Sequence, residues 1–194
     1  ALRGVIMVYI RSVAAGLAAL SLYALQPASA SERNPDAHVH GVSVLNIAID
    51  GKTVEAELVA PGADIVGFEG TPSTPADRKA IERAVKVLRN GNAVLELPKA
   101  AQCTFKEVEI ESSLIDAAAK ANREQGHNHD HKQEQHAEFE VHYHLNCEAP
   151  DRLTYIEVRA FHHFPNMREV ELRAISPKGQ GAAELTPQSS RFKF

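Results

Sequence analysis

Histidine is concentrated in one part of this chain. Six of its ten histidines lie in residues 126–144, whereas residues 41–125 contain none. The neutral imidazole ring is a common protein ligand for zinc, copper, iron and nickel. Tracts this rich in histidine have metal binding as their main chemical rationale. The tract therefore predicts a site for a divalent metal ion.

Some of the histidines occur at the spacing of a β-strand. Residues i and i+2 of a strand point to the same face, so residues 137–147 would place His142 and His144 together on a polar face beside carboxylates. His38 and His40 repeat this spacing at the start of another expected strand. If the two strands were neighbours, both pairs could aim nitrogen atoms at one ion. The predicted strand-borne ligands are His38, His40, His142 and His144.

The other histidines lie in a stretch that we expect to be a long, mobile loop. Residues 113–136 form a connection longer than most loops of compact domains. A short helix is expected within it, over residues 114–123. The histidine-rich part of this stretch is too polar to bury apolar area. Neighbouring carboxylates could accept the ring N–H groups or act as a fourth ligand. The predicted loop ligands are His127, His129, His131 and His136, and the assisting acids are Asp130, Glu138 and Glu140.

The histidines also have explanations that involve no metal ion. A lone surface histidine is usually a solvated side chain, and the sequence leaves open whether His162 and His163 are ligands. Clustered imidazoles could instead respond to acid at about pH 6. The number, type and crowding of the ligands favour metal binding over these readings.

The N-terminus predicts export from the cytoplasm. Arg3 and Arg11 precede a short apolar stretch that ends in an Ala-Ser-Ala sequence at residues 28–30. This pattern is typical of a secretory signal peptide, which we place at residues 1–30, followed by a polar tether at residues 31–37. An uncleaved anchor is the alternative, but the apolar stretch is shorter than the roughly 18 to 20 residues that a membrane span needs. We expect no stable membrane insertion after cleavage.

The cysteines and the net charge narrow the function further. The chain has two cysteines, Cys103 and Cys147, and in an exported protein such a pair predicts a disulfide. The alternative, two thiolates in a soft metal site, would require both to stay reduced outside the cytoplasm. The formal net charge of −4 argues against a nucleic-acid surface, which needs clustered Lys and Arg.

The remaining pattern predicts a single α+β domain over residues 38–194. Two β-rich runs flank an Asp-Gly turn at residues 50–51, which indicates a hairpin. One main helix should begin after Thr74 and end near Asn90-Gly91. Further strands are expected at residues 102–112 and 137–147, with a last hairpin at residues 169–186. We expect an antiparallel sheet, with the His-rich insertion at about residues 113–136.

Ligand softness limits the choice of metal. Copper(I) prefers thiolates and thioethers, whereas imidazole and carboxylate suit divalent ions. Met167 is the one methionine after the predicted signal peptide, and the cysteines are expected to be paired. Copper(I) is therefore disfavoured, while zinc(II), copper(II) and nickel(II) remain open on ligand identity alone.

Several phrases of the sequence resemble one protein family. The phrases are HVHG, LVAPGADIVGFEG, HYHLNC and FHHFP, together with the cysteine pair and the His-rich insertion. They resemble the ZrgA-like family of zinc-regulated periplasmic zinc-uptake proteins over residues 36–194. The resemblance implies a periplasmic zinc-binding protein that works with an ABC-type importer. It also implies a zinc-binding set made of His38, His40, His127, His129, His131, His136, His142 and His144.

These observations predict a periplasmic protein that captures Zn²⁺ and supports zinc uptake, not an enzyme. One alternative is an exported zinc metalloenzyme, although the sequence contains no HExxH motif. Another is a periplasmic copper(II) or nickel(II) binding or buffering protein. A third is an envelope interaction module whose imidazoles respond to acid.

Overall fold

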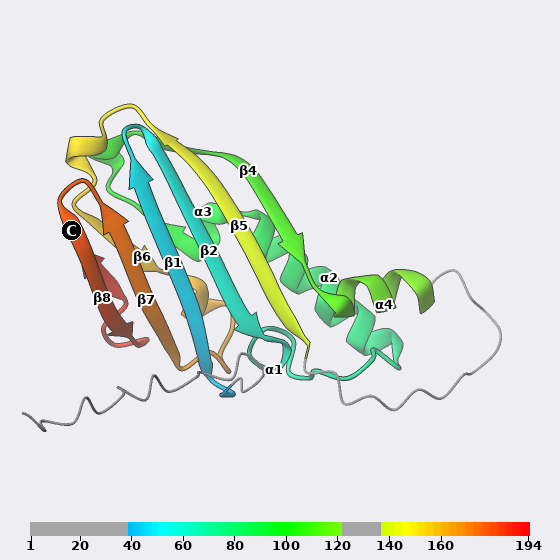
Figure 1. The fold of residues 1–194 in the computed structure, drawn as a ribbon. Coiled ribbons are helices and arrows are strands. Elements are labelled where there is room, and N and C mark those ends of the chain that lie inside the picture. The colour runs from blue at the N-terminus through cyan, green and yellow to red at the C-terminus, as the bar shows by residue number, and fades with distance from the viewer. Residues whose placement is uncertain (1–38, 122–136) are drawn as a thin grey trace, which may run out of the picture. The chain divides into compact units, whose positions relative to one another are not determined.

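The computed structural model of this protein describes residues 39–121 and 137–194. The central feature is a six-stranded sheet with the strand order β4-β5-β2-β1-β7-β8 (Figure 1). Its strands are β1 (Val42–Asp50), β2 (Thr53–Pro61), β4 (Cys103–Glu111), β5 (Glu138–Cys147), β7 (Glu169–Ser176) and β8 (Gly179–Leu185). A smaller sheet, in the order β3-β6-β9, consists of β3 (Leu95–Glu96), β6 (Tyr155–Val158) and β9 (Arg191–Lys193).

Two helices of more than two turns accompany the sheets in the described residues, α2 (Pro75–Arg89) and α4 (Ser113–Ala121). Single α-helical turns occur at α1 (Gly62–Ile65) and α3 (Gly91–Val94), and 3₁₀ turns at η1 (Lys99–Ala101), η2 (Pro150–Arg152) and η3 (Ala160–His162). The combination confirms the predicted α+β class. The main predicted helix is α2, and the predicted short helix at residues 114–123 corresponds to α4.

The central sheet has one buried face and one open face. Every second residue of β5 is buried, namely Phe139, Val141, Tyr143, Leu145 and Cys147, and the alternate residues are partly exposed. This alternation is the one that the sequence predicts for a strand with one face in the core. Figure 1 shows α2 and the smaller sheet on one side of the central sheet. The partly exposed residues of β5 therefore belong to the uncovered side.

The β1–β2 hairpin forms at the predicted turn. Asp50 pairs with Thr53, which leaves Gly51 and Lys52 as a two-residue loop. Gly51 has a φ of +54°, a backbone conformation that glycine adopts without steric cost. The short loop fixes the register of β1 against β2, and with it the row of residues that each strand shows on the open face.

Helix α2 begins at a capping box. The Thr74 hydroxyl accepts a hydrogen bond from the Asp77 N–H at 3.1 Å, and the Asp77 carboxylate accepts one from the Thr74 N–H at 2.8 Å. These bonds hold the pKa of the Asp77 carboxyl below its usual range. Pro75 occupies the first turn, where its missing N–H costs nothing, so the helix begins where the sequence predicts.

The apolar stripe of α2 packs against the buried face of the sheet. Ile81, Ala84 and Leu88 are buried at helical spacing. The Tyr143 hydroxyl of β5 donates to the Leu88 carbonyl at 3.0 Å, and burial raises the pKa of this tyrosine. The helix thereby fixes β5 from the core side.

The sheet is mixed, so the prediction of an antiparallel sheet is wrong. β1 pairs in parallel with β7, in a register from Val42 opposite Glu169 to Ala48 opposite Ile175. The other neighbouring pairs of the central sheet are antiparallel. Alternation of apolar and polar residues defines which face of a strand is buried, but it carries no information on the direction of the neighbouring strand.

Part of the expected insertion is helical, since α4 covers Ser113–Ala121. The rest of that insertion lies outside the described residues, as do the predicted signal peptide at residues 1–30 and the tether at residues 31–37. None of the helices in residues 39–121 and 137–194 has the length and apolar character needed to cross a membrane.

Candidate metal site

Strand β5 carries His142 and His144 on the open face of the central sheet. β5 lies between β2 and β4, so each histidine has a neighbour on both sides. His142 lies opposite Glu57 of β2 and Glu109 of β4. The neighbours of His144 are also glutamates, one on each strand. The pairing register therefore surrounds two imidazole rings with carboxylates.

Three of these side chains form a cluster that could hold a metal ion. One ligand atom each from Glu57, Glu140 and His142 lie within 4.8 Å of one another, and all three residues are partly buried. His142 Nε2 lies 3.0 Å from Glu140 Oε1. Zinc bonds of about 2.1 Å place tetrahedral ligand atoms about 3.4 Å apart, so small side-chain rotations would let this cluster, which we call the sheet-face triad, bind one ion.

Asn46, on the same open face of the sheet, positions Glu57 of the triad. The Asn46 side-chain amide of β1 donates to Glu57 Oε2 at 2.7 Å. The bond engages one carboxylate oxygen of Glu57 and so limits the rotation of this carboxylate. Partners of this kind orient metal ligands and limit the entropy lost when an ion binds.

His144 extends the same surface along β5. Its Nδ1 lies 2.5 Å from Glu55 Oε1. Together with His142 it lines a groove of about 370 Å³ whose walls are imidazoles and carboxylates throughout, namely Glu55, Glu107, Glu109, Glu111, His142 and His144. No described Lys or Arg lines this acidic groove, so a divalent cation would meet attraction from every wall.

His40 lies elsewhere in the fold. The residue of β1 that is aligned with His142 across β2 is Asn46, and His40 precedes β1. With about 3.3 Å per residue and about 4.8 Å per strand, His40 is roughly 20 Å from His142 along the strands and 10 Å across them. The structure therefore does not bring His40 together with His142 and His144. The condition for the predicted shared site, that the two strands are neighbours, is not met because β2 lies between β1 and β5.

The side chains near His40 hold the backbone at the start of β1. His40 Nε2 lies 3.0 Å from Glu69 Oε1, and the His40 side chain is 63% exposed. Next to it, the Gly41 N–H donates to Asp64 Oδ1 at 2.7 Å and the Ser43 hydroxyl donates to Asp64 Oδ2 at 3.3 Å. Burial raises the pKa of the Asp64 carboxyl. This arrangement fixes the start of β1 and explains why aspartate is needed in the phrase PGAD.

The remaining histidines fall into two groups. His38, His127, His129, His131 and His136 lie outside the described residues, as does Asp130. His162 and His163 are exposed at η3 and just after it, where the His163 ring makes an edge contact with Phe164.

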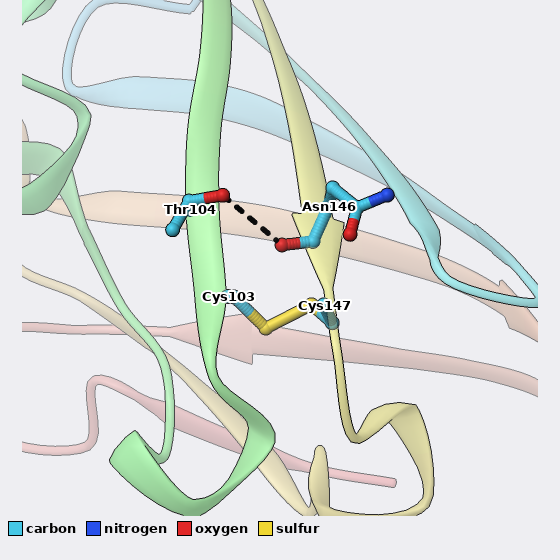
Figure 2. Close-up of a disulfide and its surroundings, with 4 residues drawn as sticks. All are labelled: Cys103, Thr104, Asn146 and Cys147. Atoms are coloured by element: carbon cyan, nitrogen blue, oxygen red, sulfur yellow. Dashed lines mark hydrogen bonds between the residues drawn. A yellow bond between two sulfur atoms is a disulfide. The ribbon is translucent and has the colours of Figure 1, made fainter.

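The cysteines are joined in a disulfide, as predicted. Cys103 of β4 lies directly opposite Cys147 of β5, and their sulfur atoms are bonded (Figure 2). In the next pair, the Thr104 hydroxyl donates to the Asn146 carbonyl at 3.4 Å (Figure 2). The disulfide excludes a thiolate metal site and anchors β4 beside β5 at one end of the acidic groove.

The acids of β2 and β4 are the ligand candidates that the sequence prediction missed. Glu55 and Glu57 share a face by the same i, i+2 rule that applies to His142 and His144. Their relevance depends on β2 lying beside β5, a pairing across 80 residues and more that alternation does not reveal. The alternating glutamates of β4 were visible as a pattern, but their pairing with the histidine strand was not.

Comparison with known families shows which family the chain belongs to. A family model described as ZrgA family zinc uptake protein matches residues 37–194. A search among curated proteins finds no match. The family is described by the uptake of zinc and not by a catalysed reaction. Because the match covers most of the sequence and fits a structure with imidazole and carboxylate side chains on an open sheet face, the chain belongs to the ZrgA family of zinc uptake proteins.

Proposed function

We propose that this protein captures Zn²⁺ in the periplasm and supports zinc uptake together with an ABC-type importer. In this proposal the sheet-face triad of Glu57, Glu140 and His142 holds one ion. The observation that carries the proposal is the convergence of three ligand atoms within 4.8 Å on strands that the core fixes from behind.

The chemistry of the triad suits zinc. Zinc takes nitrogen from histidine and oxygen from carboxylates, and it prefers four ligands in a tetrahedral arrangement. The triad supplies three, so one position would be left for water or another donor. Two carboxylates also neutralise the charge of a divalent ion, which reduces the cost of moving it out of bulk water. A site that is partly exposed allows the ion to be taken up and released, as a transport protein requires.

The acidic groove beside the triad would assist capture. Its glutamates raise the local concentration of divalent cations before any ligand bond forms. His144 and Glu55 provide further donors next to the triad. We also propose as zinc ligands the histidines that the sequence singles out away from this face, which are His38, His40, His127, His129, His131 and His136.

Competitive zinc titration of the purified chain tests this function. The background should carry Gln in place of His127, His129, His131 and His136, so that binding there does not mask the sheet. In this background, combining Glu57→Gln, Glu140→Gln and His142→Ala should weaken zinc binding by roughly 100-fold or more, because all three ligands are lost. Parallel titrations with copper(II) and nickel(II) show whether zinc is preferred at limiting ion concentrations.

A matched triple variant controls for the loss of charge. Glu82→Gln, Glu184→Gln and His162→Ala remove the same residue types from exposed positions outside the triad. This control should bind zinc as the background protein does. Equal loss of affinity in both triple variants would show that the acidity of the whole protein, and not the sheet-face triad, holds the ion.

A further inference from the structure

A second, broader groove crosses the open face of the central sheet from β5 to β8. It has a volume of about 770 Å³, within the range of cavities that bind small molecules. His142 and Glu57 of the triad lie at one end, whereas Arg173, Ile175 and Ala182 lie toward the other. We call it the crossing groove. It is larger than a single metal ion requires.

One row of paired residues runs along the crossing groove. His142 lies opposite Glu57, Glu57 lies opposite Asn46, and Asn46 lies opposite Arg173. Directly paired residues of a sheet point to the same face. The Arg173 guanidinium, the Asn46 amide and the two triad residues therefore lie in one row across the strands. Two strand spacings, about 10 Å of backbone, separate Glu57 from Arg173.

Arg173 is the positively charged side chain among the described residues that line the crossing groove. It is about half exposed, and its Nη2 donates to Glu171 Oε2 at 3.0 Å. A guanidinium has five N–H donors, so this ion pair leaves others for a ligand. Arginine is well suited to carboxylates because its planar fork can form two parallel hydrogen bonds with them.

The triad at the other end would leave a zinc coordination position open toward this groove. Three protein ligands complete a tetrahedral zinc site only when a fourth donor is added. With Glu57, Glu140 and neutral His142, the bound ion would have its charge balanced. An added carboxylate would bring a negative charge, and Arg173 is placed to balance it.

We propose that the crossing groove binds zinc together with a small polycarboxylate that chelates the ion, of the size and chemistry of citrate. One carboxylate completes the zinc coordination at the sheet-face triad, and a second is held by Arg173, with the Asn46 amide between them. This inference rests on the proposed zinc site. It goes beyond it in naming a chelated ion, and not only a free ion, as a form of zinc that the protein captures.

The carboxylate should bind only after the metal. Without zinc, Glu55 and Glu57 present negative charge to the same groove and would repel an anion. A zinc ion bound at the triad would instead attract one carboxylate of the anion. The order of binding thus distinguishes this arrangement from a simple anion site at Arg173.

Equilibrium dialysis with labelled citrate and labelled zinc tests the proposal. It uses the full chain in which His127, His129, His131 and His136 are Gln. We expect zinc-loaded protein to retain citrate at least tenfold more tightly than zinc-free protein, at one citrate per zinc held by the triad. Arg173→Gln should weaken citrate retention about tenfold and leave zinc binding without citrate unchanged.

Arg159→Gln is the matched control, because Arg159 is a similarly exposed arginine in an ion pair with Glu96 on the smaller sheet. It should retain citrate as the unaltered protein does. Citrate that removes zinc without itself being retained, or equal retention in the Arg173 and Arg159 variants, would overturn the proposal. Failure of the zinc site itself would appear separately, as absent binding in the titration without citrate.

Discussion

Two regions of this protein, the open face of β5 and the start of β1, both place histidines beside carboxylates, but the carboxylates differ in the bonds that they make. At β5, His142 and His144 project from a sheet face among glutamates that line an acidic groove. At the start of β1, His40 pairs with Glu69, and the adjacent carboxylate of Asp64 is buried and bonded to Gly41 and Ser43.

The difference shows what makes a carboxylate available to a metal ion. Asp64 uses both oxygens to accept hydrogen bonds that fix the chain, so binding an ion there would break buried bonds. Glu140 instead contacts the imidazole ring of His142, which we propose as a metal ligand. A shared ion could replace that contact at little cost. Residue type and spacing are similar in the two regions. The hydrogen bonds that each carboxylate already makes are the reason why we assign Asp64 to structure and propose Glu140 for metal binding.

The largest effect is expected from breaking the link between β4 and β5. Replacing Cys103 and Cys147 together by Ser should lower the free energy of unfolding by about 4 kcal/mol, because the bond closes a long loop in the unfolded chain. Urea unfolding without reductant measures this change. Zinc affinity at the sheet-face triad should also fall, since β4 forms one wall of the acidic groove. An unchanged zinc affinity would show that β4 contributes nothing to capture.

A somewhat smaller loss of stability is expected at the start of β1. Asp64→Ala should cost about 3 kcal/mol, because it leaves the Gly41 N–H without its acceptor in a buried position. Zinc affinity at the triad should stay within about twofold, since the two regions are distant. Asp151→Ala, at an exposed position, is the control and should change stability by less than about 0.5 kcal/mol. A large loss of zinc binding in the Asp64 variant would break the distinction between the two regions.

A moderate effect on binding is expected from His144→Ala. The ring lines the acidic groove but is not part of the triad, so zinc affinity should fall about tenfold, or about 1.4 kcal/mol. His163→Ala removes an exposed histidine outside the groove and should leave affinity unchanged. Competitive titration in the Gln background described above measures both. A loss as large as that of the triple variant of the sheet-face triad would place His144 among the direct ligands.

The smallest effect is expected from His40→Ala. Its imidazole is roughly 20 Å from His142 along the strands, so zinc affinity at the triad should change by less than about twofold. The same titration measures it. A loss comparable to that of the triple variant of the sheet-face triad would mean that His40 and the triad contact one ion, which contradicts the strand order of the sheet.

The sequence allowed the local features of this fold to be predicted. The alternation in β5 correctly placed His142 and His144 on the polar face and Cys147 on the buried one. The capping residues at Thr74 located the main helix, and the cysteine pair predicted the disulfide. Each of these depends on neighbours in the sequence or on composition, which physical rules connect directly to structure.

The partners of each strand could not be predicted in the same way. The parallel pairing of β1 with β7 and the position of β2 between β1 and β5 depend on contacts between distant parts of the chain. For this reason the sequence did not indicate Glu55 and Glu57 as candidate ligands, although their i, i+2 spacing placed them on one face. For the same reason His40 was expected beside His142 and His144, from which β2 separates it. Spacing along a strand predicts a face, whereas a metal site needs the strand next to it.

Anomalous X-ray diffraction from zinc-soaked crystals of the chain tests the central claim most directly, because it locates each ion. The account predicts an ion about 2.0 to 2.2 Å from a ring nitrogen of His142 and from oxygens of Glu57 and Glu140. Zinc bound at other positions only, with His142 and Glu140 still in the hydrogen bond of the present structure, would contradict it.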